Sequence, residues 1–288
     1  MEKITRSVRI KPGGTVFNST RQWLAYADDV VILGRTEGYI KRTLEEMAAI
    51  TQQIGLQMND TKTKYMINRQ DGNKVKETEL MGKRYEKVES FKYLGAVMTS
   101  LNEIETEIKS KIAVGNKCYY ALGPIIKGRS VPQSIKIRLY KMIIRLAVTY
   151  GAETWTLTSK IEIMLMIWER KILTKIYGPT KENGQWRMKT NEELRTKYKS
   201  QDIVTIIKIQ GLEWLGRVSR MNETRPVKKI FEGKLAGRRG RGRPRLRWMN
   251  DVEDDLRKLG VKRWRKKALN REEWASILKE IKAKLKGP

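Results

Sequence analysis

The sequence predicts an α+β fold in which short strands come first and helices follow. In about the first 100 residues, short apolar runs alternate with polar turns, whereas from Leu101 onward the apolar residues recur at helical spacing. The 288 residues, 40% of them apolar, allow one large or two modest domains with a real core. We therefore expect three parts, covering residues 1–100, 101–232 and 233–288.

The charge of the chain indicates a polyanionic partner. The 61 Lys and Arg residues outnumber the 32 Asp and Glu residues, which gives a formal net charge of +29. A membrane surface is the weaker alternative, because the basic residues are spread over the chain and accompany no long apolar segment.

The residue types that are missing exclude several kinds of chemistry. Histidine is absent, which excludes histidine acid–base catalysis, Ser-His or Cys-His nucleophiles and zinc fingers of the Cys/His type. With Cys118 as the one cysteine, no intrachain disulfide can form. No apolar run approaches the roughly 20 residues of a membrane span. We expect no signal peptide, no transmembrane segment, and a nuclear or cytoplasmic location.

The stretch Gln22–Leu33 is expected to form a β-hairpin with two carboxylates at its turn. Asp28 and Asp29 stand between the apolar runs Trp23–Ala25 and Val30–Leu33, which are typical of buried strands. Two adjacent negative charges favour a bound divalent cation, because such ions take carboxylate oxygens. A solvated Asp-Asp turn is the alternative, and the stretch alone does not decide between them.

One helix and several short strands are expected up to residue 100. Thr36 can cap a helix that continues to about Ile54 and ends at Gly55. Its buried stripe would consist of Ile40, Leu44, Met47, Ala48 and Ile54. The elements expected after it are a short strand around Tyr65–Asn68, a hairpin or loop over 69–90, and a strand or strand–turn over Ser90–Val97 with Lys92 exposed.

Four apolar stripes predict helices between residues 101 and 221. They are Ile104, Ile108, Ile112, Tyr119 and Leu122; Ile135, Leu139, Met142, Ile143, Leu146 and Tyr150; Ile161, Met164, Leu165, Trp168, Ile172 and Ile176; and Ile203, Ile206, Ile207, Trp214 and Val218. Pro132 would begin the second helix, and Gly178-Pro179 would end the third. Stripes this regular are typical of a bundle core rather than of a ligand site.

A basic linker and two helices are expected at the end of the chain. The segment Lys234–Arg247 carries seven positive charges, no negative charge, and several Gly and Pro residues. One helix would run from about Leu246 to Leu259, and another would begin at the cap Asn270. The spacing of Trp248, Trp264 and Trp274 suits a small helical core better than base stacking.

Sequence blocks in this order resemble those of reverse transcriptases. Tyr26-Ala27-Asp28-Asp29 matches the Y-A-D-D signature of that family. Two further blocks resemble palm motifs of the same family: Gly55-Leu56 with Asn59 and Lys62-Thr63-Lys64, and Phe91-Lys92-Tyr93-Leu94-Gly95. The later blocks resemble the thumb region of non-LTR retrotransposon reverse transcriptases of the endonuclease–reverse transcriptase type. They are Leu139-Tyr140-Lys141; Tyr150-Gly151-Ala152-Glu153-Thr154-Trp155; Glu169-Arg170-Lys171-Ile172-Leu173; Trp214-Leu215-Gly216; Gly242-Arg243-Pro244-Arg245 with Arg247-Trp248; and Arg271-Glu272-Glu273-Trp274. Each block alone is weak evidence for the family, but the blocks in this order are strong evidence. Together they cover nearly the whole chain.

The resemblance implies a fold, site residues, cofactors and partners. Residues 1–100 would be a partial palm, 101–232 a helical thumb and connection, and 233–288 a basic C-terminal region. Asp28 and Asp29 would hold Mg²⁺ or Mn²⁺, and Lys62 would lie near the phosphates of the incoming nucleotide. Residues beside the primer or nucleotide would be Tyr26, Phe91, Tyr93, Leu94 and Gly95. The partners would be an RNA template, a DNA primer or target, and deoxynucleoside triphosphates. Taken singly, Lys62 also fits a solvated loop lysine, and the aromatic residues fit strand packing.

One part of the family pattern is missing from the sequence. A reverse transcriptase needs a further metal-binding aspartate on an earlier strand, but Glu2 is the one acidic residue before Asp28. We therefore expect this chain to correspond to the C-terminal portion of such an enzyme, beginning within the palm, and to be inactive by itself.

The basic segment is expected to contact nucleic acid. Its arginines are Arg238, Arg239, Arg241, Arg243, Arg245 and Arg247. The run Arg241-Gly242-Arg243-Pro244 also resembles the core of an AT-hook, whereas a flexible basic linker or a nuclear-import patch are the alternatives. For the whole chain, three hypotheses stay open: a polymerase portion, a non-catalytic nucleic-acid-binding protein, and a decayed fragment of an element.

Overall fold

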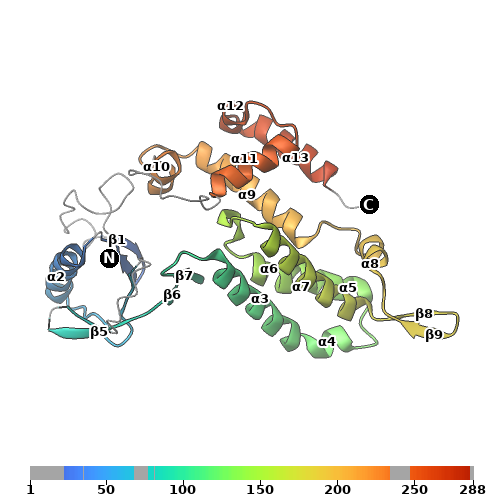
Figure 1. The fold of residues 1–288 in the computed structure, drawn as a ribbon, viewed down its shortest axis with the longest axis horizontal. Coiled ribbons are helices and arrows are strands. Elements are labelled where there is room, and N and C mark those ends of the chain that lie inside the picture. Colours follow the sequence, from blue (N-terminus) through green and yellow to red (C-terminus); the bar gives the residue numbers. More distant parts are fainter. Residues whose placement is uncertain (1–22, 35, 68–76, 81, 234–246, 286–288) are drawn as a thin grey trace. The chain divides into compact units, whose positions relative to one another are not determined.

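The chain forms an α+β fold, as predicted, with small sheets followed by helices (Figure 1). The computed structural model describes residues 23–34, 36–67, 77–80, 82–233 and 247–285. They divide into two compact units. Unit 1 comprises the described residues within Met1–Glu103 and Asn222–Gly242, and unit 2 those within Ile104–Met221 and Arg243–Pro288.

The described part of unit 1 consists of short paired strands and two helices. Its elements are β1 (Trp23–Tyr26), β2 (Asp29–Ile32), α2 (Glu37–Gln53), β3 (Lys64–Tyr65), β4 (Glu77–Leu80), β5 (Lys83–Lys87), β6 (Ser90–Tyr93), β7 (Ala96–Thr99) and α10 (Pro226–Glu232). β1 pairs with β2, β6 pairs with β7, and a third sheet has the order β3-β5-β4 with β3 parallel to β5. The hairpin or loop predicted over 69–90 is thus a hairpin in its described part, and the strand–turn over Ser90–Val97 is confirmed with Lys92 exposed.

Helix α2 supplies the apolar centre of unit 1. Met47 packs against Val30, Ile32 and Ile50, whereas Leu44 and Tyr85 share a cluster with Ile32, Ile40, Met58 and Tyr65. Thr36 occupies the N-cap position, although its side chain accepts no hydrogen bond from the described residues. The predicted stripe is wrong at Ile54, which is exposed because it is the C-cap residue and has left helical geometry.

The first hairpin is less buried than its apolar sequence suggests. In β1, Leu24, Ala25 and Tyr26 are exposed, whereas the side chains of Val30–Ile32 in β2 are half-buried. The expectation of two buried strands is therefore wrong for β1. The physical reason is that α2 packs on β2, where Met47 covers Val30 and Ile32.

Unit 2 is mainly helical. Its elements are α3 (Ile104–Ala121), α4 (Gly123–Lys127), α5 (Gln133–Leu139), the π-helical η1 (Tyr140–Ile144), α6 (Arg145–Thr149), the 3₁₀-helical η2 (Ala152–Thr154), α7 (Ser159–Tyr177), β8 (Thr180–Glu182), β9 (Gln185–Arg187), α8 (Asn191–Tyr198), α9 (Ile203–Ser219), α11 (Trp248–Lys258), α12 (Trp264–Leu269) and α13 (Arg271–Lys284). Helices α8 and α12 and the β8–β9 hairpin were not predicted from the sequence.

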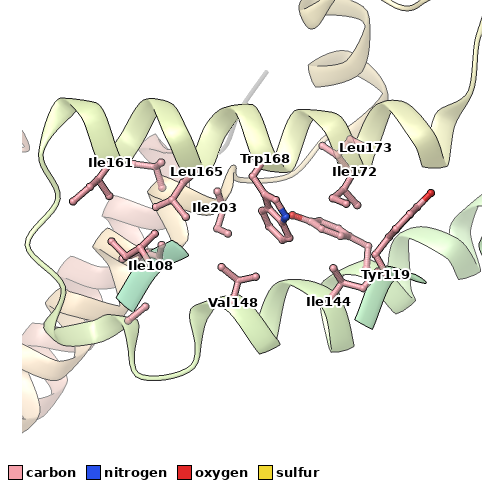
Figure 2. Close-up of a cluster of buried hydrophobic side chains, with 14 of the residues drawn as sticks. Ile108, Tyr119, Ile144, Val148, Ile161, Leu165, Trp168, Ile172, Leu173 and Ile203 are labelled. Carbon is pink, nitrogen blue, oxygen red and sulfur yellow. The ribbon is translucent and has the colours of Figure 1, made fainter. Parts of the chain in front are cut away.

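The core of unit 2 lies between α3, α6, α7 and α9. The stripe predicted for α7 is confirmed, and Figure 2 shows Leu165 and Trp168 pointing from this helix toward Val148 and Ile144. Helix α3 approaches α6 and α7 closely because Gly115 has no side chain. A Cβ at Gly115 would lie 2.4 Å from Val148 and 2.8 Å from Trp168. Trp168 satisfies its indole N–H by donating to Oδ1 of Asn116, 2.9 Å away.

The stripe predicted for the helix after Pro132 is wrong. Ile135, Met142, Ile143, Leu146 and Tyr150 are exposed, and Leu139 is half-buried. The fully buried side chains in this region are Tyr140, Ile144 and Val148. The helix contains the π-helical turn η1, whose wider winding changes which residues reach the core.

The C-terminal helices pack on α9. Trp274 of α13 is buried, and its Nε1 donates to the carbonyl oxygen of Leu212 at 3.1 Å. Trp248 at the start of α11 donates to the carbonyl oxygen of Glu153 at 2.9 Å. The core role predicted for Trp274 is thus confirmed, whereas Trp248 is half-buried. Asn270 caps α13 by accepting from the backbone N–H groups of Glu272 and Glu273.

Among the described helices, none combines the length and the apolar character that a membrane span requires.

Candidate functional site

The two carboxylates lie at the tip of the β1–β2 hairpin. Strand pairing places Tyr26 directly opposite Asp29, so Ala27 and Asp28 form the two-residue turn. Ala27 adopts φ +51°, a left-handed conformation that an L-residue other than glycine adopts at a cost of roughly 1–2 kcal/mol. Asp28, Asp29 and Tyr26 are all exposed at this tip. The predicted position at the hairpin turn is therefore confirmed for Asp28, and Asp29 follows it as the first residue of β2.

The structure brings one of the predicted primer-side residues within electrostatic range of this tip. Burial raises the pKa of the Tyr93 phenol, and the negative charge of Asp29 raises that pKa further. Tyr93 is the last residue of β6. Phe91 is also half-buried and shares a strand face with Tyr93, because side chains two residues apart point the same way.

The Leu94-Gly95 pair forms the tight turn between β6 and β7. Both residues have positive φ values, +49° for Leu94 and +80° for Gly95, as a type I′ hairpin turn requires. Gly95 meets this requirement without strain, whereas Leu94 does not and stands exposed at the tip. The block F-x-Y-L-G thus has a local structural reason for its last residue.

Lys62 lies in a turn that is closed by Asn59. The Asn59 side chain accepts hydrogen bonds from the Lys62 N–H at 3.1 Å and from the Thr61 hydroxyl at 2.7 Å. Its backbone carbonyl accepts one from the Thr63 hydroxyl at 2.8 Å. The ammonium of Lys62 is exposed and has no hydrogen bond or ion pair with any described residue, the acidic hairpin included. Its side chain is therefore open to solvent or to a ligand.

Asp60 connects this turn to the neighbouring sheet, which the sequence analysis missed. It accepts hydrogen bonds from Nζ of Lys83 at 2.6 Å and from the hydroxyl of buried Tyr85 at 3.1 Å. The bond from Lys83 is the main reason why the pKa of Asp60 is lowered. Asp60 thereby holds the turn that carries Lys62 on β5. The signal was present in the sequence, since an Asn-Asp pair is typical of such a turn.

The residues present do not complete a two-metal site among the described residues. Asp28 and Asp29 offer the oxygen ligands that magnesium or manganese take. However, no group of three or more His, Cys, Asp or Glu side chains that could hold a metal ion occurs in the described ranges. A two-metal site for phosphoryl transfer holds its ions roughly 3.5–4 Å apart and needs further ligands. The donor set at the hairpin is therefore partial.

Of the six arginines predicted to contact nucleic acid, the structure describes Arg247. Arg238, Arg239, Arg241, Arg243 and Arg245 lie outside the described residues. Arg247 is exposed at the N-cap of α11, where its carbonyl oxygen accepts the N–H of Asp251 at 3.1 Å. The helix start thus fixes the backbone of Arg247, and its side chain is exposed to solvent.

The block around Glu169 belongs to a buried polar network. Tyr140 donates to one carboxylate oxygen of Glu169 at 2.6 Å, and the Ile203 N–H donates to the other at 2.8 Å. Burial is the main cause that raises the pKa of Glu169 to about 7. Its position on the stripe of Leu165 and Ile172 was the available signal, because a carboxylate on an apolar face must find partners.

The comparisons with known proteins agree with the resemblance over part of the chain. Residues 1–98 match the family model described as reverse transcriptase (RNA-dependent DNA polymerase). An uncharacterized transposon-derived protein of Caenorhabditis elegans is 24% identical over 272 residues, covering 89% of this chain and 94% of that protein. No solved structure matches. The acidic hairpin lies inside the residues that match the reverse transcriptase family.

Proposed function

We propose that this chain is the C-terminal part of an RNA-directed DNA polymerase of a non-LTR retrotransposon. The observation that carries the proposal is the position of Asp28 and Asp29 at a hairpin tip within the residues that match the reverse transcriptase family. A carboxylate pair held by strand pairing is a suitable ligand set for a divalent ion. The similarity to a transposon-derived protein along most of the chain supports a mobile-element origin.

The proposal gives each predicted site residue a role. Asp28 and Asp29 hold Mg²⁺ or Mn²⁺, and Lys62 contacts the phosphates of the incoming nucleotide. The primer and nucleotide contact Tyr26, Phe91, Tyr93, Leu94 and Gly95. The negative charge of Asp29 raises the pKa of Tyr93, and this electrostatic effect supports a site shared by the two residues. Residues 1–100 form part of the palm, 101–232 the thumb and connection, and 233–288 the basic C-terminal region.

We also propose that the chain by itself has no polymerase activity. The two carboxylates at the hairpin are not joined by a third metal ligand among the described residues. In the sequence, Glu2 is the one acidic residue before Asp28. A further carboxylate from another segment would complete the site in the full-length enzyme.

A primer-extension assay tests both statements. The purified chain, given a DNA primer on an RNA template with magnesium or manganese, is expected to add no nucleotides. A longer chain that includes the upstream reading frame is expected to extend the primer, and Asp28→Asn should abolish that extension. Extension by the present chain that Asp28→Ala abolishes would refute the incomplete site. Full extension by the longer Asp28→Asn variant would refute the polymerase proposal.

A non-catalytic nucleic-acid-binding protein is the second candidate, and the charge of +29 favours it. Such a protein would use the helical unit and the basic C-terminal arginines, in the nucleus or the cytoplasm. The sequence-independent affinity for nucleic acid should fall as the salt concentration rises. Binding of Lys and Arg releases cations from the phosphates, and this release is less favourable when the solution already contains more salt. Binding to RNA, duplex DNA and a hybrid, measured across a salt series, tests this candidate. It is refuted if the chain binds none of the three at about 0.1 M salt.

A further inference from the structure

The β8–β9 hairpin of unit 2 carries a tryptophan that the core does not use. Trp186 is 70% exposed, whereas Trp155, Trp168 and Trp274 are each at most 6% exposed. No aromatic or cation–π contact is found for Trp186 with the described residues. A large indole left in water on a short hairpin is available to a partner.

Strand alternation separates an anchored face of the hairpin from a free face. Thr180 pairs with Arg187, Lys181 with Trp186, and Glu182 with Gln185 (Figure 1, yellow). Arg187 forms an ion pair with Glu182 and a bidentate pair with Glu193 of α8, at 2.9 and 2.8 Å. These contacts hold one face against the start of α8. Lys181 and Trp186, directly opposite each other, therefore share the other face.

Two further features hold the hairpin in place before any partner binds. Asn183 and Gly184 have φ values of +48° and +83°, which match a type I′ turn. Lys189 donates to the carbonyl oxygens of Gly178 and Pro179, each at 2.9 Å, and so connects the end of β9 to the end of α7. Because the hairpin is preorganised, a partner that binds Trp186 does not have to order it.

The charge around the free face is positive. From Gly178 to Lys199 the sequence has six Lys or Arg residues and three Glu residues. Two of those three carboxylates, Glu182 and Glu193, are paired with Arg187. The ammonium of Lys181 is exposed and pairs with no described residue. An exposed indole beside an available cation complements a nucleobase joined to a phosphate.

We propose that Trp186 and Lys181 bind single-stranded nucleic acid, with the indole stacked on an unpaired base and the ammonium on a backbone phosphate. A paired base would not serve, because both of its faces are covered within a duplex. Stacking on an aromatic side chain tolerates any base, so the site would favour single strands without reading sequence. The inference rests on the proposed function only in requiring nucleic acid as the partner of the chain.

Binding of the full chain to a labelled oligo(U) of about 16 nucleotides, measured by fluorescence anisotropy, tests the inference. Trp186→Ala should weaken this binding about tenfold, whereas Trp186→Phe should retain most of it. Lys181→Gln should weaken binding a fewfold and reduce its salt dependence. Gln185→Ala, on the same strand but the opposite face, is the matched control and should change nothing. A blunt duplex should be affected little by any of these variants.

Photocrosslinking gives a second measurement that needs no variant. Oligo(U) that contains 4-thiouridine should crosslink to the peptide that includes Trp186 in the wild-type chain. The inference is overturned if wild-type affinity survives Trp186→Ala, if the duplex is weakened equally, or if crosslinks occur only elsewhere. If only this inference is wrong, the wild-type chain still binds nucleic acid, but not through Trp186 and Lys181. If the wild-type chain binds neither RNA nor DNA, the proposed nucleic-acid function fails with it.

Discussion

The indole N–H of Trp274 donates to the carbonyl oxygen of Leu212 at 3.1 Å, and the ring lies directly over Gly216. Two sequence blocks that are far apart along the chain thereby form one packing unit. In the block Trp214-Leu215-Gly216, Gly216 has no side chain and leaves the surface of α9 open at this point. The ring of Trp274, from the block Arg271-Glu272-Glu273-Trp274, covers that surface. These blocks have a structural role, since Trp274 is fully buried in this contact.

Replacement of Gly216 should destabilise unit 2. A Cβ at this position would lie 2.3 Å from two atoms of the Trp274 ring, which is closer than packed atoms can approach. We expect Gly216→Ala to lower the free energy of unfolding by about 1–3 kcal/mol, measured by urea denaturation. The control is Gly123→Ala in α4, where a Cβ would meet none of the described atoms within 4 Å. Equal effects of the two substitutions would contradict the packing described for Trp274.

The π-helical turn predicts opposite outcomes for two adjacent isoleucines. Ile144 is fully buried, whereas Ile143 is exposed. We expect Ile144→Ala to lower the free energy of unfolding by about 2–5 kcal/mol, because it leaves a cavity between α6 and α7. Ile143→Ala should have an effect of about 0.5 kcal/mol or less. If Ile143→Ala proved the more destabilising of the two, the stripe expected from the sequence would be the true one.

The buried Glu169 should make stability depend on pH. Its folded-state pKa of about 7 lies above the ordinary value of 4.5, so the folded chain binds the proton more tightly than the unfolded chain. The contribution of this group to stability is therefore full below pH 4.5 and is lost as the pH rises toward 7. The total loss is on the order of 3 kcal/mol.

Glu169→Gln isolates this contribution, because the amide does not titrate. Unfolding free energies measured from pH 4.5 to 7 should fall less steeply for Glu169→Gln than for the wild type. Glu192→Gln, an exposed glutamate at the start of α8, is the control and should leave the slope unchanged. Parallel pH curves for the wild type and Glu169→Gln would show that Glu169 is not protonated in the fold.

The strained turn beside the catalytic candidates should respond to glycine. Ala27 has φ +51°, where glycine is preferred, so we expect Ala27→Gly to raise the free energy of unfolding of unit 1 by about 1 kcal/mol. Ala48→Gly, inside α2, should lower it by roughly 0.5–1 kcal/mol, because glycine weakens a helix interior. Thermal unfolding of both variants measures the two signs. A loss of stability in Ala27→Gly would show that the turn is not strained.

Local sequence was enough to predict features that depend on near neighbours. The hairpin around Asp28 and Asp29 follows from apolar runs on both sides of a turn, and strand pairing fixes the pair at the tip. The stripe of α7 and its end at Gly178 follow from helical spacing and from a residue that adopts φ +66°. The order of the motifs likewise required no coordinates.

Tertiary structure decided what depends on residues far apart in the chain. The side of the helix after Pro132 that is buried depends on the π-helical turn and on the contact of Tyr140 with Glu169. The hydrogen bond from Tyr85 to Asp60 and the packing of Trp274 on Gly216 both join separate elements. The effect of the Asp29 charge on the pKa of Tyr93 likewise depends on two separate strands. Periodicity shows which residues of a segment share a face. Only the neighbours that pack on that face determine whether it is buried, paired or left open to a ligand.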